Sequence, residues 1–455
     1  MRKHDSSTQY TVLAALLLLA GTSPALDGDI EAPPVIEPIT APFEMPEIAP
    51  PVFKDQSFRI TDYGAVDDGV TLNTAAFKKA IAACAAAGGG TVVVPDGTWL
   101  TGPIHLKSNI NLHIQEGAEV YFSTVYSDYL PTVLTRWEGM ECYNYSPLIY
   151  AIDCENIAIT GKGTLIGNGQ AWWGWKKTQI QVAAEPLNKL CAEGAPVEVR
   201  QFGIENGLRP QFIQPFRCKN VLIEGITIKD GPFWTIHPVY CENIIVRGVS
   251  IRTHGPNTDG VNLDSCNGGL VEYCFFRTGD DSICLKSGIN EDGWRVGKPC
   301  ENVVIRRCET IHGNGAVVIG SEMSGGVQNI YAYDMNIISN KRGIRIKSMR
   351  GRGGFVKNVY FKDFKIGKLR DDVVIINMKY GMSTVQPKGD RVPVFENIFI
   401  KNVHCEEARS GLRMIGLDDQ KIRGVTIENT TVGTVAQKNH IRNVENLKII
   451  GGNLK

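Results

Sequence analysis

The feature that most constrains the fold of this chain is a short sequence motif, which we call the repeated word, that recurs along it. The word ends in Asn followed by Ile, Val or Leu, and in four instances it opens with Cys and Glu or Lys. Its Asn stands at positions 156, 220, 243, 302, 329, 358, 397 and 446, and the shorter intervals are 23 to 39 residues. Alternating apolar residues follow each instance, which indicates a strand with one buried face. Asn tolerates the left-handed backbone of a tight turn, so stacked Asn side chains can hydrogen-bond in a ladder.

An internal period of this length is typical of a solenoid, in which each repeat packs on its neighbours. Short strands without intervening helices favour a parallel β-helix over leucine-rich or ankyrin repeats. We therefore expect an all-β fold, a single-stranded right-handed parallel β-helix. A solenoid needs its ends covered, and residues 73–87 are helical in composition, with a candidate cap at Asn73 and a glycine stop at 88–90. This helix is expected to close the first coil.

The first 55 residues differ from the repeats. Residues 1–25 combine a basic start, an apolar run and small residues, which predicts a signal peptide, since the run is too short to span a bilayer. Residues 26–55 are rich in proline and predict an extended linker outside the core. Residues 56–455 are then the β-helix domain. We expect a secreted or periplasmic protein, without deciding between the two.

Composition limits the classes of binding partner and bears on whether the cysteines are free or disulfide-bonded. The 48 basic and 48 acidic residues cancel, so neither nucleic acid nor an anionic membrane is favoured as a partner. A monomer is expected. Twelve cysteines in an exported chain suggest disulfides, but those at 154, 218, 241 and 300 open the repeated word and occupy equivalent positions. We interpret these four as a buried column of free thiols, with disulfides as the alternative.

The stretch from residue 255 to 350 aligns as four successive rungs. Offsets of 22, 34 and 27 residues superimpose the apolar positions of strands that begin near 261, 283, 317 and 344. This register predicts three columns of polar side chains: Asp259 with Asp281, Asp280 with Asn314, and Lys286 with Lys347. Because neighbouring strands lie about 4.8 Å apart, the three carboxylates gather within about one rung spacing.

A basic pair follows the acidic cluster. Arg345 and Lys347 are two residues apart in a strand, so they share a face, and with the aspartates they suit a polyanionic sugar. Strict alternation would turn Asp280 and Asp281 to opposite faces, so the strand must bend at its start, which Gly279 permits. Each feature alone is common as a turn cap or an exposed strand pair. Together, in consecutive rungs, they predict a functional site.

These motifs resemble those of glycoside hydrolase family 28, the polygalacturonases, whose signatures are Asn-Thr-Asp, Asp-Asp, Gly-His-Gly and Arg-Ile-Lys. The matching segments are Asn257-Thr258-Asp259, Asp280-Asp281, Gly313-Asn314-Gly315 and Arg345-Ile346-Lys347. The resemblance implies a pectin-lyase-like solenoid and an inverting hydrolase that cleaves galacturonic-acid linkages in pectin. It implies a pectic polysaccharide or oligogalacturonide as partner, and no cofactor or metal is expected.

The resemblance also implies residue roles. Asp280 is expected to be the catalytic acid, with Asp259 and Asp281 sharing the attacking water. The expected substrate-binding residues are Asn257, Asn314, Arg345, Lys347, Lys286 and Tyr380. Lys286 has a second interpretation, in which it only balances Asp264 or Asp280.

The departure from the family is Asn314, which stands where the family usually has His. An amide can hydrogen-bond but cannot carry charge, and His312 is a candidate substitute, or else an ordinary turn residue. The change leaves open a branch that acts on rhamnogalacturonan or decorated galacturonan, or a weak or inactive member.

A long insertion, residues 170–214, contains Trp172-Trp173-Gly174-Trp175. These rings either stack on sugar or pack the loop itself. The insertion could close one end of a groove, which would favour exo action. Two rival functions remain: a non-catalytic β-helix that binds pectic carbohydrate, and a pectate lyase that works by β-elimination, usually with Ca²⁺.

Overall fold

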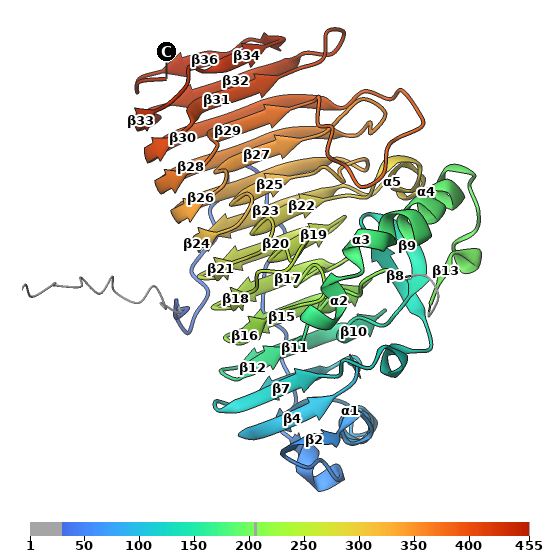
Figure 1. The fold of residues 1–455 in the computed structure, drawn as a ribbon. Coiled ribbons are helices and arrows are strands. Elements are labelled where there is room, and N and C mark those ends of the chain that lie inside the picture. The colour runs from blue at the N-terminus through green and yellow to red at the C-terminus, as the bar shows by residue number, and fades with distance from the viewer. Residues whose placement is uncertain (1–29, 204–206, 455) are drawn as a thin grey trace, which may run out of the picture.

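The computed structural model of the protein describes residues 30–203 and 207–454. The chain winds into a right-handed parallel β-helix, as the repeated word predicts, and its coils stack from the N-terminal to the C-terminal end (Figure 1). The predicted signal peptide, residues 1–25, lies outside the described residues. Among the described residues, no helix is both long enough and apolar enough to cross a membrane.

Each complete coil contributes strands to three faces, which we number in chain order. The first face consists of β1 (Ser57–Arg59), β3 (Gly90–Val94), β6 (Ile110–Ile114), β11 (Glu155–Gly161), β15 (Lys219–Glu224), β17 (Glu242–Arg247), β20 (Asn267–Glu272), β23 (Cys300–Arg306), β26 (Val327–Asn340), β28 (Phe355–Leu369), β30 (Val394–Ala408), β32 (Ile422–Glu428), β35 (Val444–Glu445) and β36 (Lys448–Ile450). The second face consists of β2 (Asp68–Leu72), β4 (Gly97–Thr101), β7 (Ala118–Phe122), β12 (Thr164–Ile166), β16 (Thr227–Lys229), β18 (Ser250–Arg252), β21 (Phe275–Arg277), β24 (Glu309–His312) and β33 (Thr431–Val435), joined by the C-terminal parts of β26, β28 and β30. The third face consists of β5 (Ile104–His105), β10 (Ile149–Ile152), β14 (Ile213–Phe216), β19 (Val261–Asp264), β22 (Ile283–Lys286), β25 (Val317–Ile319), β27 (Ile344–Lys347), β29 (Asp372–Asn377), β31 (Ser410–Ile415) and β34 (His440–Arg442).

The register of the third face is the one that the sequence alignment predicts. Val261 pairs with Ile283, Ile283 with Val317, and Val317 with Ile344. All four side chains are fully buried inside the coil, so alternate residues of these strands face outwards. The outward positions therefore stack in columns across neighbouring rungs, and these columns position the site.

The recurring Asn forms the expected ladder at a corner of the coil. Asn220 Nδ2 donates to Asn156 Oδ1 at 2.8 Å and Asn243 Nδ2 donates to Asn220 Oδ1 at 2.8 Å, while Asn329 Nδ2 donates to Asn302 Oδ1 at 2.9 Å. These residues have φ between 52° and 58°, the left-handed conformation that Asn tolerates. The ladder therefore satisfies side-chain amides at a position where the backbone must turn.

The four cysteines of the column, at positions 154, 218, 241 and 300, are buried and free, as predicted. All twelve are unpaired thiols with buried side chains. The column that contains Cys218 and Cys241 includes a fifth member, Cys266, because Glu242 pairs with Asn267 in the adjacent rung. Cys266 opens a word without the recurring Asn, so the sequence pattern missed it.

A helix closes the N-terminal coil. Helix α1 (Thr74–Ala86) buries Phe77, Ile81 and Cys84 and packs beside β1 and the short 3₁₀ turn η1 (Ile60–Tyr63). Asn73 occupies the cap position, but its side chain makes no hydrogen bond to the helix. Its Oδ1 instead accepts from the Val66 N–H at 2.8 Å, so the expected side-chain cap is wrong and the amide secures the preceding loop.

The insertion folds into a helical body on the side of the solenoid. It contains α2 (Gln170–Trp173), α3 (Lys176–Gln179), the π-helical turn η3 (Ile180–Ala184), α4 (Glu185–Ala192), the 3₁₀ turn η4 (Val197–Val199) and β13 (Gln201–Phe202). It packs beside the antiparallel hairpin of β8 (Val133–Trp137) and β9 (Met140–Asn144), which follows the 3₁₀ turn η2 (Tyr126–Tyr129), and near α5 (Asn290–Val296) (Figure 1). Trp137, Leu187, Phe233, Trp234 and Val385 share one buried apolar cluster there.

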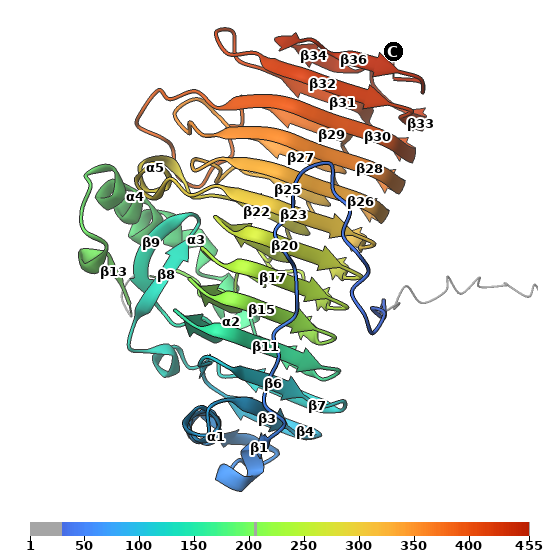
Figure 2. The same ribbon diagram turned by 180° about the vertical axis from the view of Figure 1, so that it is seen from behind.

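Residues 30–55, which we call the strap, contain no helix or strand and run along the outside of the first face (Figure 2). The extended conformation agrees with the proline-rich composition. The strap packs Ile36, Ile39 and Ile48 onto an apolar stripe formed by Ala158, Leu222, Ile245, Leu270 and Val304. The expectation that these strands bury only one face is therefore wrong, because the strap buries their outward residues as well.

Candidate active site

Two neighbouring rungs of the third face carry the predicted acidic cluster. Asp259 precedes β19, and Asp280 and Asp281 precede β22, so all three lie just before the strands. Strict alternation does not apply there, and the chain bends before β22, as we expected. Gly279 is required at this bend because a Cβ at that position would lie 2.0 Å from the carbonyl oxygen of Gly255. The close approach of two backbones, more than an unusual φ, explains this glycine.

Asn314 is clamped to Asp280 by two hydrogen bonds. Its backbone N–H donates to the Asp280 carbonyl oxygen at 2.9 Å, and its Nδ2 donates to Asp280 Oδ1 at 3.1 Å. The flanking glycines permit this approach: a Cβ on Gly313 would lie 2.9 Å from the same carbonyl oxygen, and one on Gly315 would lie 3.0 Å from Asp281 Oδ1. The segment therefore holds an amide against the predicted acid, in the column that the register predicts.

Arg345 and Lys347 extend from β27 towards Asp281. Lys347 Nζ lies 2.9 Å from Asp281 Oδ2, and Arg345 Nη1 lies 3.8 Å from Asp281 Oδ1. The ring centroid of Tyr380 lies 5.3 Å from Arg345 Cζ and 5.4 Å from Lys347 Nζ. Burial alone would raise the pKa of Asp281, but Lys347 and then Arg345 outweigh it, so this pKa is lowered. Asp281 is therefore the carboxylate of the cluster that ionises most readily.

Asp259 and Asp280 are shifted in the opposite direction. Burial, then the charge of Asp280, raises the pKa of Asp259 well above its ordinary value, and burial, then the charge of Asp281, raises the pKa of Asp280. The cluster can therefore keep a proton at a pH where Asp281 has lost its own. Asp259 and Asp281 are only 3% and 2% exposed, whereas Asp280 is half-buried. Of the two carboxyls with a raised pKa, Asp280 is the more exposed.

Lys286, at the end of β22, has a main partner that the sequence analysis missed. Its Nζ lies 2.6 Å from Glu322 Oε2 and 3.9 Å from Asp259 Oδ2. The same nitrogen lies 4.1 Å from the ring centroid of Trp234. Glu322 follows β25 in the next rung, and only its place in a segment shared with the family could have drawn attention to it.

Asp264, the other expected partner of Lys286, belongs to a separate buried network. It accepts a hydrogen bond from Arg136 Nη1 at 2.9 Å, and its other oxygen lies 3.2 Å from His237 Nε2. Burial lowers the pKa of His237, which favours the neutral imidazole. Arg136 is the main counter-ion of Asp264, and Lys286 adds a weaker contribution that lowers the pKa of Asp264 and of Asp280, so both interpretations of Lys286 stay open.

Asn257 is held by the insertion. It has a φ of 56°, and its Oδ1 accepts from Arg209 Nη2 at 2.8 Å. Arg209 also donates to the carbonyl oxygen of Pro256 at 2.6 Å and to Gln179 Oε1 at 3.1 Å. Since Arg209 and Gln179 belong to the insertion, these bonds tie that body to the loop that carries Asp259. No sequence signal pointed to Arg209, because it comes from a separate segment.

His312 does not replace the missing histidine. It lies at the exposed end of β24 on the second face. Within the part of the chain that the structure describes, its ring makes no hydrogen bond or ion pair with the acidic cluster. It is therefore a surface residue at the end of a strand, so neither the substitute interpretation nor the turn interpretation describes it.

The tryptophans of the insertion mostly pack the loop. Trp172 is fully buried, with ring centroids of Tyr126 at 4.7 Å, Trp175 at 4.9 Å and Tyr129 at 5.3 Å. Trp173 is partly exposed and donates from Nε1 to the carbonyl oxygen of Gly231 at 2.9 Å. Packing of the loop is therefore the correct interpretation for Trp172.

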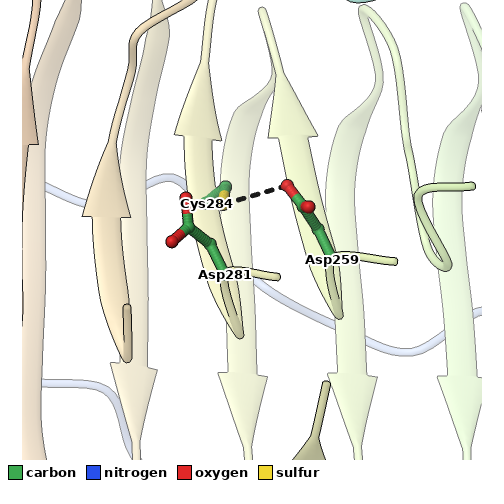
Figure 3. A group of neighbouring side chains, drawn as sticks. All are labelled: Asp259, Asp281 and Cys284. Carbon is green, nitrogen blue, oxygen red and sulfur yellow. Dashed lines mark hydrogen bonds between the residues drawn. The ribbon is translucent and has the colours of Figure 1, made fainter. Parts of the chain in front are cut away.

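One group of side chains has the spacing of metal ligands. Asp259, Asp281 and Cys284 each offer an atom within 4.8 Å of the others, and Cys284 Sγ donates to Asp259 Oδ2 at 3.5 Å (Figure 3). Lys347 and Lys286, however, already lie 2.9 Å and 3.9 Å from these carboxylates. Positive charges so close oppose a further cation. The arrangement suits proton transfer better than metal binding.

Comparison with known proteins agrees with this geometry. The sequence profile described as "Glycosyl hydrolases family 28" matches residues 201–449. A second profile, "Rhamnogalacturonase A/epimerase, pectate lyase-like", matches residues 57–113. The chain is similar to a "Probable polygalacturonase" of Vitis vinifera, with 30% identity over 84% of this chain and 75% of that protein. It is also similar to an "Exo-poly-alpha-D-galacturonosidase" of Dickeya chrysanthemi, with 29% identity over 77% of this chain and 62% of that protein.

Solved structures give the same picture. A hyperthermoactive exopolygalacturonase from Thermotoga maritima superimposes with a TM-score of 0.84 and 39% identity, covering 88% of this chain and 93% of that one. The polygalacturonase from Erwinia carotovora superimposes with a TM-score of 0.65 over 90% of this chain and 100% of that one. At 22% identity the second similarity supports the fold alone.

Proposed function

The chain belongs to glycoside hydrolase family 28, and from this premise we propose that it hydrolyses galacturonic-acid linkages in pectin. The observation that carries the proposal is the third-face cluster, in which three carboxyls with opposed pKa shifts lie beside two cations and the ring of Tyr380. Carboxyls whose environments push their pKa values apart are what an acid and a base on one substrate require. The cations match the carboxylates of the polymer.

In the proposed mechanism, Asp280 is the acid. Its raised pKa keeps the proton on the carboxyl, which donates it to the glycosidic oxygen as the bond from that oxygen to the anomeric carbon breaks. A water attacks the anomeric carbon from the opposite face and gives its proton to the ionised Asp281. The products are two shorter chains, with the configuration at the new reducing end inverted. Proton exchange with solvent restores the starting state.

The spacing of Asp259 and Asp281 supports their role in holding this water. Each offers an oxygen within 4.8 Å of the other. One water can donate to both, because each such bond is about 2.8 Å long. Asp281 Oδ1 has no hydrogen-bond partner among the described residues, so a lone pair is available there.

Arg345 supports the proposed recognition of a galacturonate carboxylate next to the scissile bond. Its Nε and Nη1 are buried without a hydrogen-bond partner anywhere in the described ranges. An incoming carboxylate that approaches this side chain would accept a charge-assisted hydrogen bond from one of these unused donors. Both Arg345 and Lys347 lie near the ring of Tyr380. Asn257, Asn314 and Lys286 complete the proposed binding set.

We propose exo action, in which the enzyme releases units from a chain end. The insertion, the β8–β9 hairpin and residues 378–393 pack into one body that reaches the cluster through Arg209 and Trp234. Glu138, at the tip of the hairpin, is 5% exposed, and burial, then the charge of Glu322, raises its pKa to about 7. This body beside the cluster leaves less room for a polymer to extend past the cleavage site. The exo-acting names of two similar proteins agree with this proposal.

The division of the chain is likewise a proposal: a signal peptide over 1–25, a proline-rich linker over 26–55 and the catalytic β-helix over 56–455. A secreted or periplasmic enzyme would meet pectin of the cell wall directly. Mass spectrometry of the N-terminus of the protein purified from its natural source would test this division. A mature chain that still begins at Met1 would contradict it.

The test of the proposed function is proton NMR of the reaction on polygalacturonate and, separately, on rhamnogalacturonan, with products resolved by size. We expect monomers from polygalacturonate, formed first as the anomer opposite to that of the cleaved linkage. A retained anomer would contradict the inverting assignment, and long oligomers would contradict exo action. An unsaturated product would indicate a lyase, and faster release from rhamnogalacturonan would redirect the substrate assignment.

A further inference from the structure

The Asn at position 314 is connected to a second residue that the family signature does not include. Arg342 Nη1 donates to Asn314 Oδ1 at 2.5 Å, while Asn314 Nδ2 donates to Asp280 Oδ1 at 3.1 Å. Arg342 lies just before β27, three residues before Arg345. The three side chains form a continuous path from a guanidinium to the proposed acid.

The chemistry of a guanidinium fixes the direction of this path. An arginine side chain has donors and no acceptor, so the amide oxygen of Asn314 must face Arg342. The amide NH₂ must then face Asp280. A reversed amide would set NH₂ against the guanidinium and a lone pair against the carboxylate, which is unfavourable at both ends. The bond from the Asn314 backbone N–H to the Asp280 carbonyl oxygen holds the same pair together at 2.9 Å.

Arg342 is itself held in place from its other side. Its Nη2 lies 2.8 Å from Asp371 Oδ2, and Asp371 Oδ1 lies 3.0 Å from Arg409 Nη1. The side chain of Arg342 is only 12% exposed. An ion pair at one end and an amide at the other leave the guanidinium little freedom to turn away.

We propose that Arg342 is a positioning residue that acts on Asp280 through Asn314: it locks the amide so that Asp280 Oδ1 always accepts a hydrogen bond, which leaves Oδ2 to carry the catalytic proton. This inference rests on the proposed role of Asp280 as acid. With Oδ1 occupied by the amide, the proton of the carboxylic acid stays on Oδ2, the oxygen that would face the substrate. The locked amide thus orients the acid but does not titrate. The histidine that the family usually has at this position can titrate.

The lock also has an electrostatic consequence. The hydrogen bond from Asn314 lowers the pKa of Asp280 and so opposes the effect of burial. Because hydrogen bonds in a chain polarise one another, a guanidinium on the amide oxygen strengthens the donor on the other side. Loss of Arg342 should therefore raise the pKa of Asp280.

The test is the pH dependence of kcat/KM on an oligogalacturonide for Arg342→Met, Arg342→Lys and Arg409→Met. We expect Arg342→Met to lower kcat about 10-fold or more with little change in KM, and to move the alkaline limb of the profile to higher pH. Arg342→Lys keeps a charged donor and should restore part of both effects. Arg409→Met removes the same charge from the far side of Asp371 and should leave the limb where it is.

A double-mutant cycle decides whether the effect runs through Asn314. In an Asn314→Leu background, Arg342→Met should produce no further movement of the limb. A limb that stays in place in Arg342→Met, or moves equally in both backgrounds, would overturn the inference. If Asp280→Asn retained activity, the proposed acid itself would be wrong, so the two failures are distinguishable.

Discussion

Two outward-facing sets of buried charge lie on different faces of the same coils, and they are completed differently. Under the strap, Glu272 joins Arg247 at 2.9 Å and Arg306 at 2.7 Å. The remaining guanidinium nitrogens donate to Glu224, Tyr333 and strap carbonyl oxygens of residues 33, 37 and 38. On the third face, Arg345 Nε and Nη1 and Asp281 Oδ1 have no hydrogen-bond partner within residues 30–203 and 207–454.

We interpret the first set as a structural charge network and the second as the proposed catalytic one. A buried charge is tolerated when its partners satisfy it, and the strap supplies carbonyl oxygens for that purpose. The third-face cluster keeps unused donors and acceptors beside the half-buried Asp280. We propose that the first network contributes to stability and that the second contributes to binding and catalysis. The predictions that follow break or sharpen this distinction.

The largest effect on stability is expected from Glu272→Gln. The substitution leaves Arg306 buried without a counter-ion and Arg247 paired with Glu224 alone, which costs about 3–5 kcal/mol. Urea denaturation should show the loss, while kcat per folded molecule stays unchanged. The matched control is Glu428→Gln, which removes an exposed ion pair with Lys401 and should cost less than about 1 kcal/mol. Equal losses in the two variants would contradict the comparison.

Arg345→Met should act on binding instead. We expect KM for oligogalacturonides to rise about 10–100-fold, because a charge-assisted bond to the substrate carboxylate contributes about 1.5–3 kcal/mol. The control is Arg413→Met, two rungs along the same column. Arg413 already pairs with Asp372 at 3.0 Å, so its loss should leave KM unchanged. Steady-state kinetics would decide between the two outcomes.

The strap offers a smaller test of the first network. Ile48 packs on the apolar stripe of the first face, and Ile48→Ser should lower the free energy of unfolding by about 1–2 kcal/mol. Val52 lies on the same strap but is 87% exposed. Val52→Ser should therefore be nearly neutral. A strap that does not dock would make both substitutions equally harmless in thermal melts.

The smallest effect is a pH-dependent gain in stability from Asp280→Asn. Asp280 has a raised pKa in the folded state, so it favours folding below its unfolded pKa of about 3.9 and loses this contribution as the pH rises through the folded pKa. At pH 7 the variant should melt at a higher temperature than the wild type, and the difference should shrink towards pH 4. A lower melting temperature at pH 7 would mean that the carboxylate stabilises the fold.

The sequence predicted the fold and most of the candidate site because both depend on the register between neighbouring rungs. The recurring Asn sets the coil length, and the offsets between Asp259, Asp281 and Lys347 follow from adjacent strands. Arg209, Trp234 and Glu322 were missed because each belongs to a loop whose path a rung alignment does not fix. Asn73 shows a related limit, since its position was correct while its hydrogen-bond partners were not.

The docking of the strap could have been anticipated in part. Proline-rich composition predicts an extended chain but does not say what that chain touches. The signal lay in the strands instead: triplets such as Ile244-Ile245-Val246 are apolar at all three positions, and a strand that is apolar on both sides is covered on both sides. Only the three-dimensional structure shows that the cover comes from residues 30–55.

The central claim is that the open third-face cluster is the catalytic one, and its most direct test is reducing-end release from polygalacturonate by the wild type and by Asp280→Asn at equal concentrations of folded protein. Asn keeps the shape of Asp280 but cannot donate a carboxylic proton. The account predicts that wild-type release falls about 10³-fold, within the range for loss of a general acid, while oligogalacturonide binding persists. Release that is unchanged in Asp280→Asn would contradict the account.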